Sequence, residues 1–187
     1  MHFRVYSVPG MWQNARVKED ITLELWSIGH SNHPADKFVG LLKQHEITVL
    51  VDVRSSPRSR FPQFQRDNLI KLVTSNGLQY LYGGTILGGL SDRKVGDATF
   101  ISKMDRMLEL TSEGQRVAMM CSEGKPCECH RAGKLMAWLH RERIGVKTTH
   151  ILPDGSLVDA REYEPKVEKH VRWPEFEPWV GSQKKLI

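Results

Sequence analysis

The fold is decided by Thr48-Val49-Leu50-Val51-Asp52-Val53, a stretch that is apolar and β-branched almost throughout. A strand with one face in water alternates apolar and polar residues, whereas a strand that is covered on both faces does not. Strands covered on both faces are typical of parallel sheets with helices packed on each side. The stretch therefore predicts an interior strand of an α/β domain.

Strand and helix patterns alternate outward from this stretch, from about Glu24 to Leu152. The predicted strands are Leu25–Ile28, Thr48–Val53, Leu78–Leu81, Val117–Cys121 and Val146–Leu152. Apolar residues at helical spacing fill the segments between them. The predicted fold class is α/β, with a mostly parallel five-stranded sheet, right-handed crossovers and helices on both faces.

A single domain over residues 23–155 suits a chain of 187 residues. Residues 1–22 fall outside the alternation and are interpreted as an N-terminal extension. Residues 156–187 carry Trp173, Phe176 and Trp179 among charges and prolines. Such a segment favours a C-terminal arm packed on the core over a platform for stacking nucleic-acid bases.

The composition restricts the classes of function. There is no apolar run of the roughly 18 residues that a membrane helix needs, and no signal-peptide core follows the first residues. A cytoplasmic protein without membrane contact is therefore expected. The net charge of +5 and the pI of about 9.2 favour an anionic partner, either a small substrate or a nucleic acid. Composition does not indicate the oligomeric state.

Polar residues follow four of the predicted strands: Gly29-His30-Ser31, Asp52 with Arg54, Tyr82, and Cys121 with Glu123. In an open parallel sheet, ligands bind outside the carboxyl ends of the strands. Each residue alone is also explained as an ordinary strand boundary, and Asp52 with Arg54 as a structural ion pair. Their coincidence at one edge predicts a shared site.

The strongest single segment runs from Cys121 to Arg131 and holds all three cysteines: Cys121, Cys127 and Cys129. An odd number of cysteines crowded together argues against a disulfide framework. A strand ends at Cys121, and a helix is predicted to begin near Cys129 or His130. Amide groups at that helix start, with Lys125 and Arg131, can hold an anion and lower the pKa of a thiol. Cys121 is thus a candidate nucleophile, and an inert buried thiol is the alternative.

Metal binding is a second interpretation of the same segment, because Cys121, Cys127, Cys129 and His130 supply four possible ligands. Structural zinc sites usually take their ligands from paired Cys-x-x-Cys knuckles, which this spacing lacks. Adjacent residues such as Cys129 and His130 also diverge at a helix start. The sequence therefore predicts no bound metal and no other cofactor.

The loop from Arg54 to Arg60 contains three arginines and three serines and is followed by Phe61 and Phe64. Guanidinium groups bind oxyanions through paired hydrogen bonds. Basic residues flanked by phenylalanine equally suit a nucleic-acid backbone and its bases. A solvated loop is the plain alternative.

These segments resemble the bacterial and archaeal proteins called domain of unknown function 488, over roughly residues 25 to 155. The resemblance rests on four motifs: Gly29-His30-Ser31, Asp52-Val53-Arg54 with Pro57, Ser59 and Arg60, Leu87-Gly88-Gly89, and Cys121-x-Glu123 leading to Cys129-His130-Arg131. Cys127 lies outside the family pattern. The resemblance names a family and no reaction.

A looser similarity links the chain to rhodanese-type sulfurtransferases and phosphatases of a similar plan, in which a strand ends in a catalytic cysteine. Here Pro126 and Cys127 stand where those loops place arginine or serine. The leading hypothesis is a cysteine-dependent enzyme acting on a sulfur- or phosphorus-centred anion, and the alternatives are a nucleic-acid module and a metal-binding protein. The predicted catalytic residues are Cys121, His30 and Glu123. The predicted anion-binding residues are Arg54, Arg60, Asp52, Ser31, Tyr82, Lys125, Cys129, His130 and Arg131.

Overall fold

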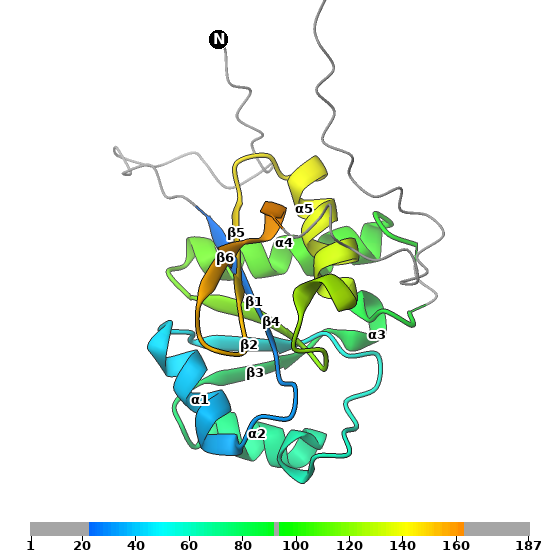
Figure 1. Ribbon diagram of the computed structural model, residues 1–187. Helices are drawn as coiled ribbons and strands as arrows, with labels where there is room; N and C mark the ends of the chain where they lie inside the picture. Colours follow the sequence, from blue (N-terminus) through cyan, green and yellow to red (C-terminus); the bar gives the residue numbers. More distant parts are fainter. Residues whose placement is uncertain (1–22, 92–93, 163–187) are drawn as a thin grey trace, which may run out of the picture.

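Six strands form one sheet in the order β3-β2-β4-β1-β5-β6 (Figure 1). The computed structural model describes residues 23–91 and 94–162. Every neighbouring pair of strands is parallel except β5 and β6. The strands are β1 (Glu24–Gly29), β2 (Val49–Asp52), β3 (Gln79–Tyr82), β4 (Val117–Cys121), β5 (Lys147–Ile151) and β6 (Leu157–Asp159). The predicted α/β class with a mostly parallel sheet is confirmed.

The helices that connect the strands are α1 (Ala35–Gln44), α2 (Arg66–Thr74), α3 (Gly84–Leu87), α4 (Ala98–Ser112) and α5 (Ala137–Glu142). A π-helical segment, Arg131–Met136, leads into α5. Short 3-10 turns occupy Pro62–Phe64, Pro126–Glu128 and Ala160–Glu162. The predicted helix after Cys129 is thus present, but its first turns are wound more widely than an α-helix.

The two faces of the sheet carry separate hydrophobic clusters. One face packs Trp26, Ile28 and Leu50 under α1 and α2, and the other packs Leu25, Val51 and residues of α4 and α5 (Figure 1). Val49, Leu50 and Val51 in β2 are all buried, as expected of a strand covered on both sides.

The chain changes direction between β1 and β4, which are neighbours in the sheet. The connection after β1 runs to α1 on one face, and the connection after β4 runs to the π-helical segment and α5 on the other (Figure 1). In open α/β sheets such a switch point opens a crevice outside the carboxyl ends of the two strands.

The prediction of five strands was wrong by one, because β6 was assigned to the C-terminal arm. This strand has only three residues and is half exposed, so it carries no periodic pattern. It pairs antiparallel with β5 after a turn in which Gly155 adopts a φ of 91°. The remainder of the proposed arm, residues 163–187, and the proposed extension 1–22 lie outside the described residues. None of the described helices is long and apolar enough to cross a membrane.

Candidate functional site

The polar residues at the carboxyl edge divide into two groups on opposite faces of the sheet. Asp52 pairs in register with Met120, so the next residue of β4, Cys121, points to the other face. Cys121 accordingly packs with Val53 and Met119 in the α4/α5 cluster. His30 instead stacks on Phe64, on the α1/α2 side, with ring centroids 4.2 Å apart. The single predicted site is therefore two sites.

Asp52 and Arg54 form a buried ion pair on the α1/α2 face. The Arg54 Nη2 donates to Asp52 Oδ2 at 2.6 Å, and Arg54 Nε donates to Asp52 Oδ1 at 2.9 Å. Tyr80 donates its hydroxyl to the same carboxylate at 2.9 Å, and Arg54 Nη1 donates to the carbonyl of Phe64. Burial, with the carboxylate beside it, raises the pKa of Tyr80. All three guanidinium nitrogens of Arg54 thus donate to partners within the protein.

His30 links that network to the loop after β1. Burial is the main cause that lowers the pKa of His30 to about 4, so the ring is neutral at pH 7. Its Nδ1 lies 2.8 Å from the Ser31 carbonyl, which can only accept, so the proton sits on Nδ1. The Nε2 then accepts from Arg54 Nη1 at 3.3 Å. Both ring nitrogens of His30 thus have partners within the protein.

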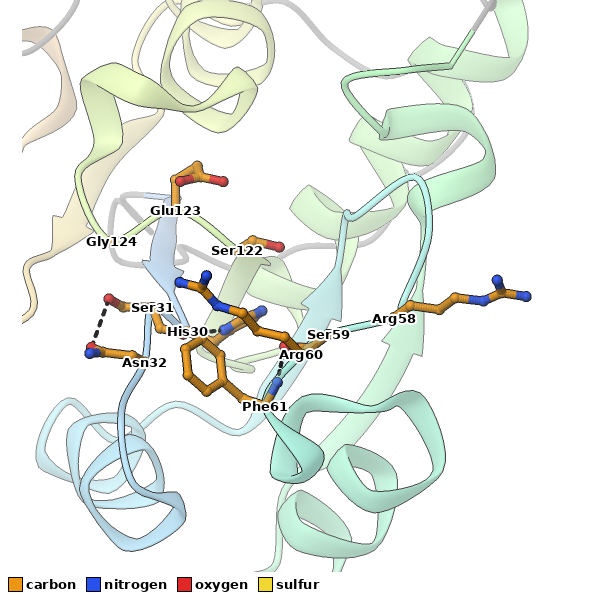
Figure 2. Close-up of a pocket in the computed structure, with 10 residues that line it drawn as sticks. All are labelled: His30, Ser31, Asn32, Arg58, Ser59, Arg60, Phe61, Ser122, Glu123 and Gly124. Atoms are coloured by element: carbon orange, nitrogen blue, oxygen red, sulfur yellow. Dashed lines mark hydrogen bonds between the residues drawn. The ribbon is translucent and has the colours of Figure 1, made fainter.

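A cavity of about 620 Å³ opens above this network at the switch point between β1 and β4. It is lined by His30, Ser31, Asn32, Arg58, Ser59, Arg60, Phe61, Ser122, Glu123 and Gly124 (Figure 2). These residues come from the loops that follow β1, β2 and β4. We call this cavity the edge pocket. Its lining holds two cations and one carboxylate.

Arginine and serine side chains make the lining of the edge pocket polar and basic. The Arg60 guanidinium lies over the Phe61 ring, 4.9 Å from its centroid, among the other lining residues (Figure 2). Arg58 extends away from them (Figure 2). Ser31 adopts a φ of 49°, in the left-handed region, and its amide donates to the Ser122 carbonyl at 2.9 Å. That contact joins the loop after β1 to the loop after β4.

Four of the residues predicted for the site line the edge pocket: His30, Ser31, Arg60 and Glu123. The lining also includes Asn32, Ser122 and Gly124, which the sequence did not single out, and Arg58, Ser59 and Phe61 from the basic loop and its flank. Tyr82 lies elsewhere, with its hydroxyl on the Ser55 carbonyl and its ring under Arg66. Lys125 is exposed beside Glu128.

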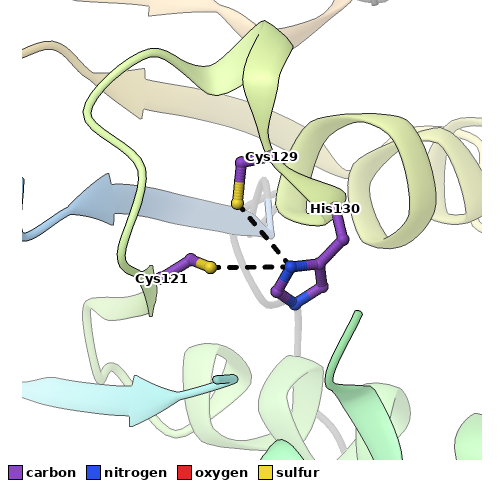
Figure 3. Close-up of side chains that lie close together, drawn as sticks. All are labelled: Cys121, Cys129 and His130. Atoms are coloured by element: carbon purple, nitrogen blue, oxygen red, sulfur yellow. Dashed lines mark hydrogen bonds between the residues drawn. The ribbon is translucent and has the colours of Figure 1, made fainter. Parts of the chain in front are cut away.

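The second group, on the α4/α5 face, is a buried cluster of Cys121, Cys129 and His130 (Figure 3). The Nδ1 of His130 lies 3.5 Å from Cys121 Sγ and 3.7 Å from Cys129 Sγ. Their exposed fractions are 7%, 2% and 7% in chain order. Cys127 is half-buried and stands outside this cluster. We call the three residues the thiol–imidazole cluster.

Ionisation in the thiol–imidazole cluster differs from the expectation of a Cys121 thiolate. A hydrogen bond with Cys129, together with burial, raises the pKa of Cys121 well above its usual value. Burial also opposes ionisation of Cys129, but the hydrogen bond from Cys121 and the Arg131 guanidinium lower its pKa. Between the two thiols, ionisation of Cys129 is therefore favoured over ionisation of Cys121.

Arg131 is fully buried and joins the two sites. Its Nη1 and Nη2 donate to the carbonyls of Glu123 and Gly124, at 2.5 and 2.9 Å. These carbonyls belong to the loop that follows Cys121 and lines the edge pocket. Arg131 thus fixes the loop and places a cation beside the thiols.

The fold and the edge site define an α/β protein with a pocket at the switch point of a mostly parallel sheet. Residues 34–97 match the family Domain of unknown function DUF488, which confirms over that range the family recognised from the sequence. The matched range contains the Asp52-Val53-Arg54 and Leu87-Gly88-Gly89 motifs and ends before the cysteines. No match was found among curated proteins or among solved structures.

Proposed function

We propose that the protein binds a small phosphate-bearing ligand in the edge pocket. The observation that carries this proposal is the lining at the switch point, which includes two arginines, Arg58 and Arg60, and one carboxylate, Glu123. Of the two arginines, Arg60 is the one whose guanidinium lies among the other lining residues (Figure 2). Three serine hydroxyls, Ser31, Ser59 and Ser122, add hydrogen-bonding groups that suit phosphate oxygens. A volume of about 620 Å³ falls in the range of small-molecule sites.

Arg60 is the principal anion-binding side chain in this proposal. Its guanidinium lies over Phe61, so the ring covers one face of the group. The N–H groups lie in the guanidinium plane and point outward, where they can donate to a phosphate. The Asp52–Arg54–His30 network reaches the pocket through His30, which accepts a hydrogen bond from Arg54 Nη1. Arg54 and Asp52 add no net charge to the pocket, because they neutralise each other. In this proposal they are positioning residues that hold His30 through Arg54.

The thiols take no part in the proposed binding step. Neither Cys121 nor Cys129 is among the described residues that line the edge pocket, and both lie buried on the opposite face of the sheet. The ligand would therefore be recognised by the loops after β1, β2 and β4.

Replacing Arg60 with alanine should weaken binding of inorganic phosphate and of a nucleoside monophosphate by about 10-fold or more, because a charge-assisted hydrogen bond contributes about 1.5–3 kcal/mol. Isothermal titration calorimetry measures this loss. Arg106→Ala is the matched control, since it removes the same charge from the exposed face of α4. The proposal fails if wild-type protein binds neither probe, or if both variants lose affinity equally.

A nucleic-acid interface is the second candidate. It is favoured by Arg58, which is exposed and extends away from the other lining residues, and by the Arg60–Phe61 pair in the same loop (Figure 2). A random single-stranded oligonucleotide distinguishes the two. Binding to a nucleic-acid backbone falls steeply as salt rises, because counterions are released. Oligonucleotide binding with that salt dependence, and no binding of the mononucleotide, would replace the small-ligand proposal with this one.

A further inference from the structure

The thiol–imidazole cluster brings three metal-ligating side chains to one point, independently of the edge pocket. Cys121 ends β4, while Cys129 and His130 follow the 3-10 turn at Pro126–Glu128. We propose that Cys121 Sγ, Cys129 Sγ and His130 Nδ1 bind one divalent metal ion of the zinc class. The donors are two sulfurs and one imidazole nitrogen. Zinc binds such donors, whereas the harder ions Mg²⁺ and Ca²⁺ bind oxygen ligands.

The distances between the donors fit such an ion. Zinc bonds of about 2.3 Å to sulfur and about 2.0–2.1 Å to nitrogen, at a tetrahedral angle, place the two donors about 3.6 Å apart. The two Nδ1–Sγ separations in the cluster are 3.5 and 3.7 Å. The two sulfurs lie within 4.8 Å of each other. The three donors thus surround a volume of the right size for one ion.

The tautomer of His130 also supports a metal site. Its Nε2 lies 3.1 Å from the Val53 carbonyl, which can only accept a hydrogen bond, so the ring proton is on Nε2. The lone pair on Nδ1 then faces both sulfurs. A metal ion between the three side chains would accept an electron pair from this nitrogen and from each sulfur. A ligating histidine whose other N–H is held by a backbone carbonyl is the usual arrangement at metal sites.

Backbone geometry explains why the adjacent pair Cys129 and His130 does not diverge. Cys129 is extended, with φ −131° and ψ 144°, and the chain turns helical only at His130, with φ −59° and ψ −20°. Two consecutive helical residues would instead point about 100° apart. Gly89 packs against the imidazole, since an added Cβ there would lie 3.1 Å from the ring. The Leu87-Gly88-Gly89 motif thereby helps to fix the ring.

Among the described residues, no fourth histidine, cysteine or carboxylate donor joins the cluster. Sites with three protein ligands are characteristic of catalytic zinc, which keeps a position for water or substrate, whereas structural zinc has four. The competing interpretation of the same residues is a dithiol that cycles through a Cys121–Cys129 disulfide. Both interpretations predict reactive thiols, so the test must report on the metal itself.

The full-length protein, purified under reducing conditions and freed of metal with a chelator, is titrated with Co²⁺ and then with Zn²⁺. We expect one equivalent of Co²⁺ to give a thiolate-to-cobalt charge-transfer band and the intense visible absorption of four-coordinate cobalt. Zn²⁺ should abolish both signals by displacement. This readout uses the wild-type chain. Absence of the band, or a disulfide forming between the two cysteines in the presence of excess Zn²⁺, would overturn the proposal.

Two cysteine variants locate the site. Cys129→Ser should weaken Zn²⁺ binding by more than about 100-fold, since it removes a ligand and loss of supporting groups alone costs 10–100-fold. Cys127→Ser removes a thiol outside the cluster and should keep wild-type affinity. Circular dichroism confirms that each variant is folded. If Cys129→Ser does not fold, His130→Gln tests the same ligand set, and retention of wild-type affinity in a folded variant contradicts the site.

Discussion

Replacing Asp52 with asparagine should lower the free energy of unfolding by about 3–5 kcal/mol, the cost of leaving a buried charge without its partner. Asp52 is fully buried and Arg54 is 3% exposed, so water cannot compensate the guanidinium. The carboxylate also accepts the Tyr80 hydroxyl at 2.9 Å. Asparagine keeps the shape and removes the charge, so the loss reports mainly on electrostatics.

Asp105→Asn is the matched control for this variant. Asp105 also accepts two hydrogen bonds from one arginine, Arg143, but the two side chains are 34% and 30% exposed. Partly exposed pairs contribute about 1 kcal/mol or less. Urea denaturation followed by circular dichroism measures both variants. Equal, small losses would show that burial does not make the Asp52–Arg54 pair a larger contribution to stability than the partly exposed pair.

Replacing Gly29 with alanine should destabilise the protein by about 1–3 kcal/mol or more, because the backbone would have to move. A Cβ at Gly29 would lie 1.8 Å from the Glu123 carbonyl oxygen and 2.7 Å from its carbon. It would also approach Arg131 Nη1, at 3.0 Å. Displacing this loop should weaken phosphate binding and Zn²⁺ binding together, since residues 122–124 line the pocket and follow Cys121.

Gly40→Ala provides the comparison, since a Cβ there meets nothing within 4 Å. Gly40 lies inside α1, where alanine should stabilise by about 0.5–1 kcal/mol. Thermal unfolding of both variants gives the difference directly. A Gly29→Ala protein as stable as wild type, with unchanged ligand affinities, would show that the loop is not held against β1 as described.

The sheet was predictable because its central strands are unambiguous. The unbroken apolar run around Val49–Val51 admits one interpretation, and the helices beside it have clear apolar faces. Strand β6 was missed because three half-exposed residues carry no period. The placement of polar residues at the carboxyl edge followed from the strand ends alone.

The division of the edge into two sites was not predictable, because it depends on register. Asp52 pairs with Met120, one residue before Cys121, and a shift by one would have put both side chains on the same face. The sequence predicts Arg54 and Arg131 as anion-binding residues. In the structure Arg54 pairs with Asp52, and Arg131 donates to backbone carbonyls, partners that the sequence does not indicate.

X-ray absorption at the zinc edge, on protein loaded with one equivalent of Zn²⁺, tests the proposed metal site directly. We expect a first shell with two sulfurs at about 2.3 Å and at least one imidazole nitrogen at about 2.0–2.1 Å. The same spectrum of Cys127→Ser should be unchanged, since that thiol lies outside the cluster. A first shell of oxygen and nitrogen alone would contradict the assignment of Cys121, Cys129 and His130 as the metal site.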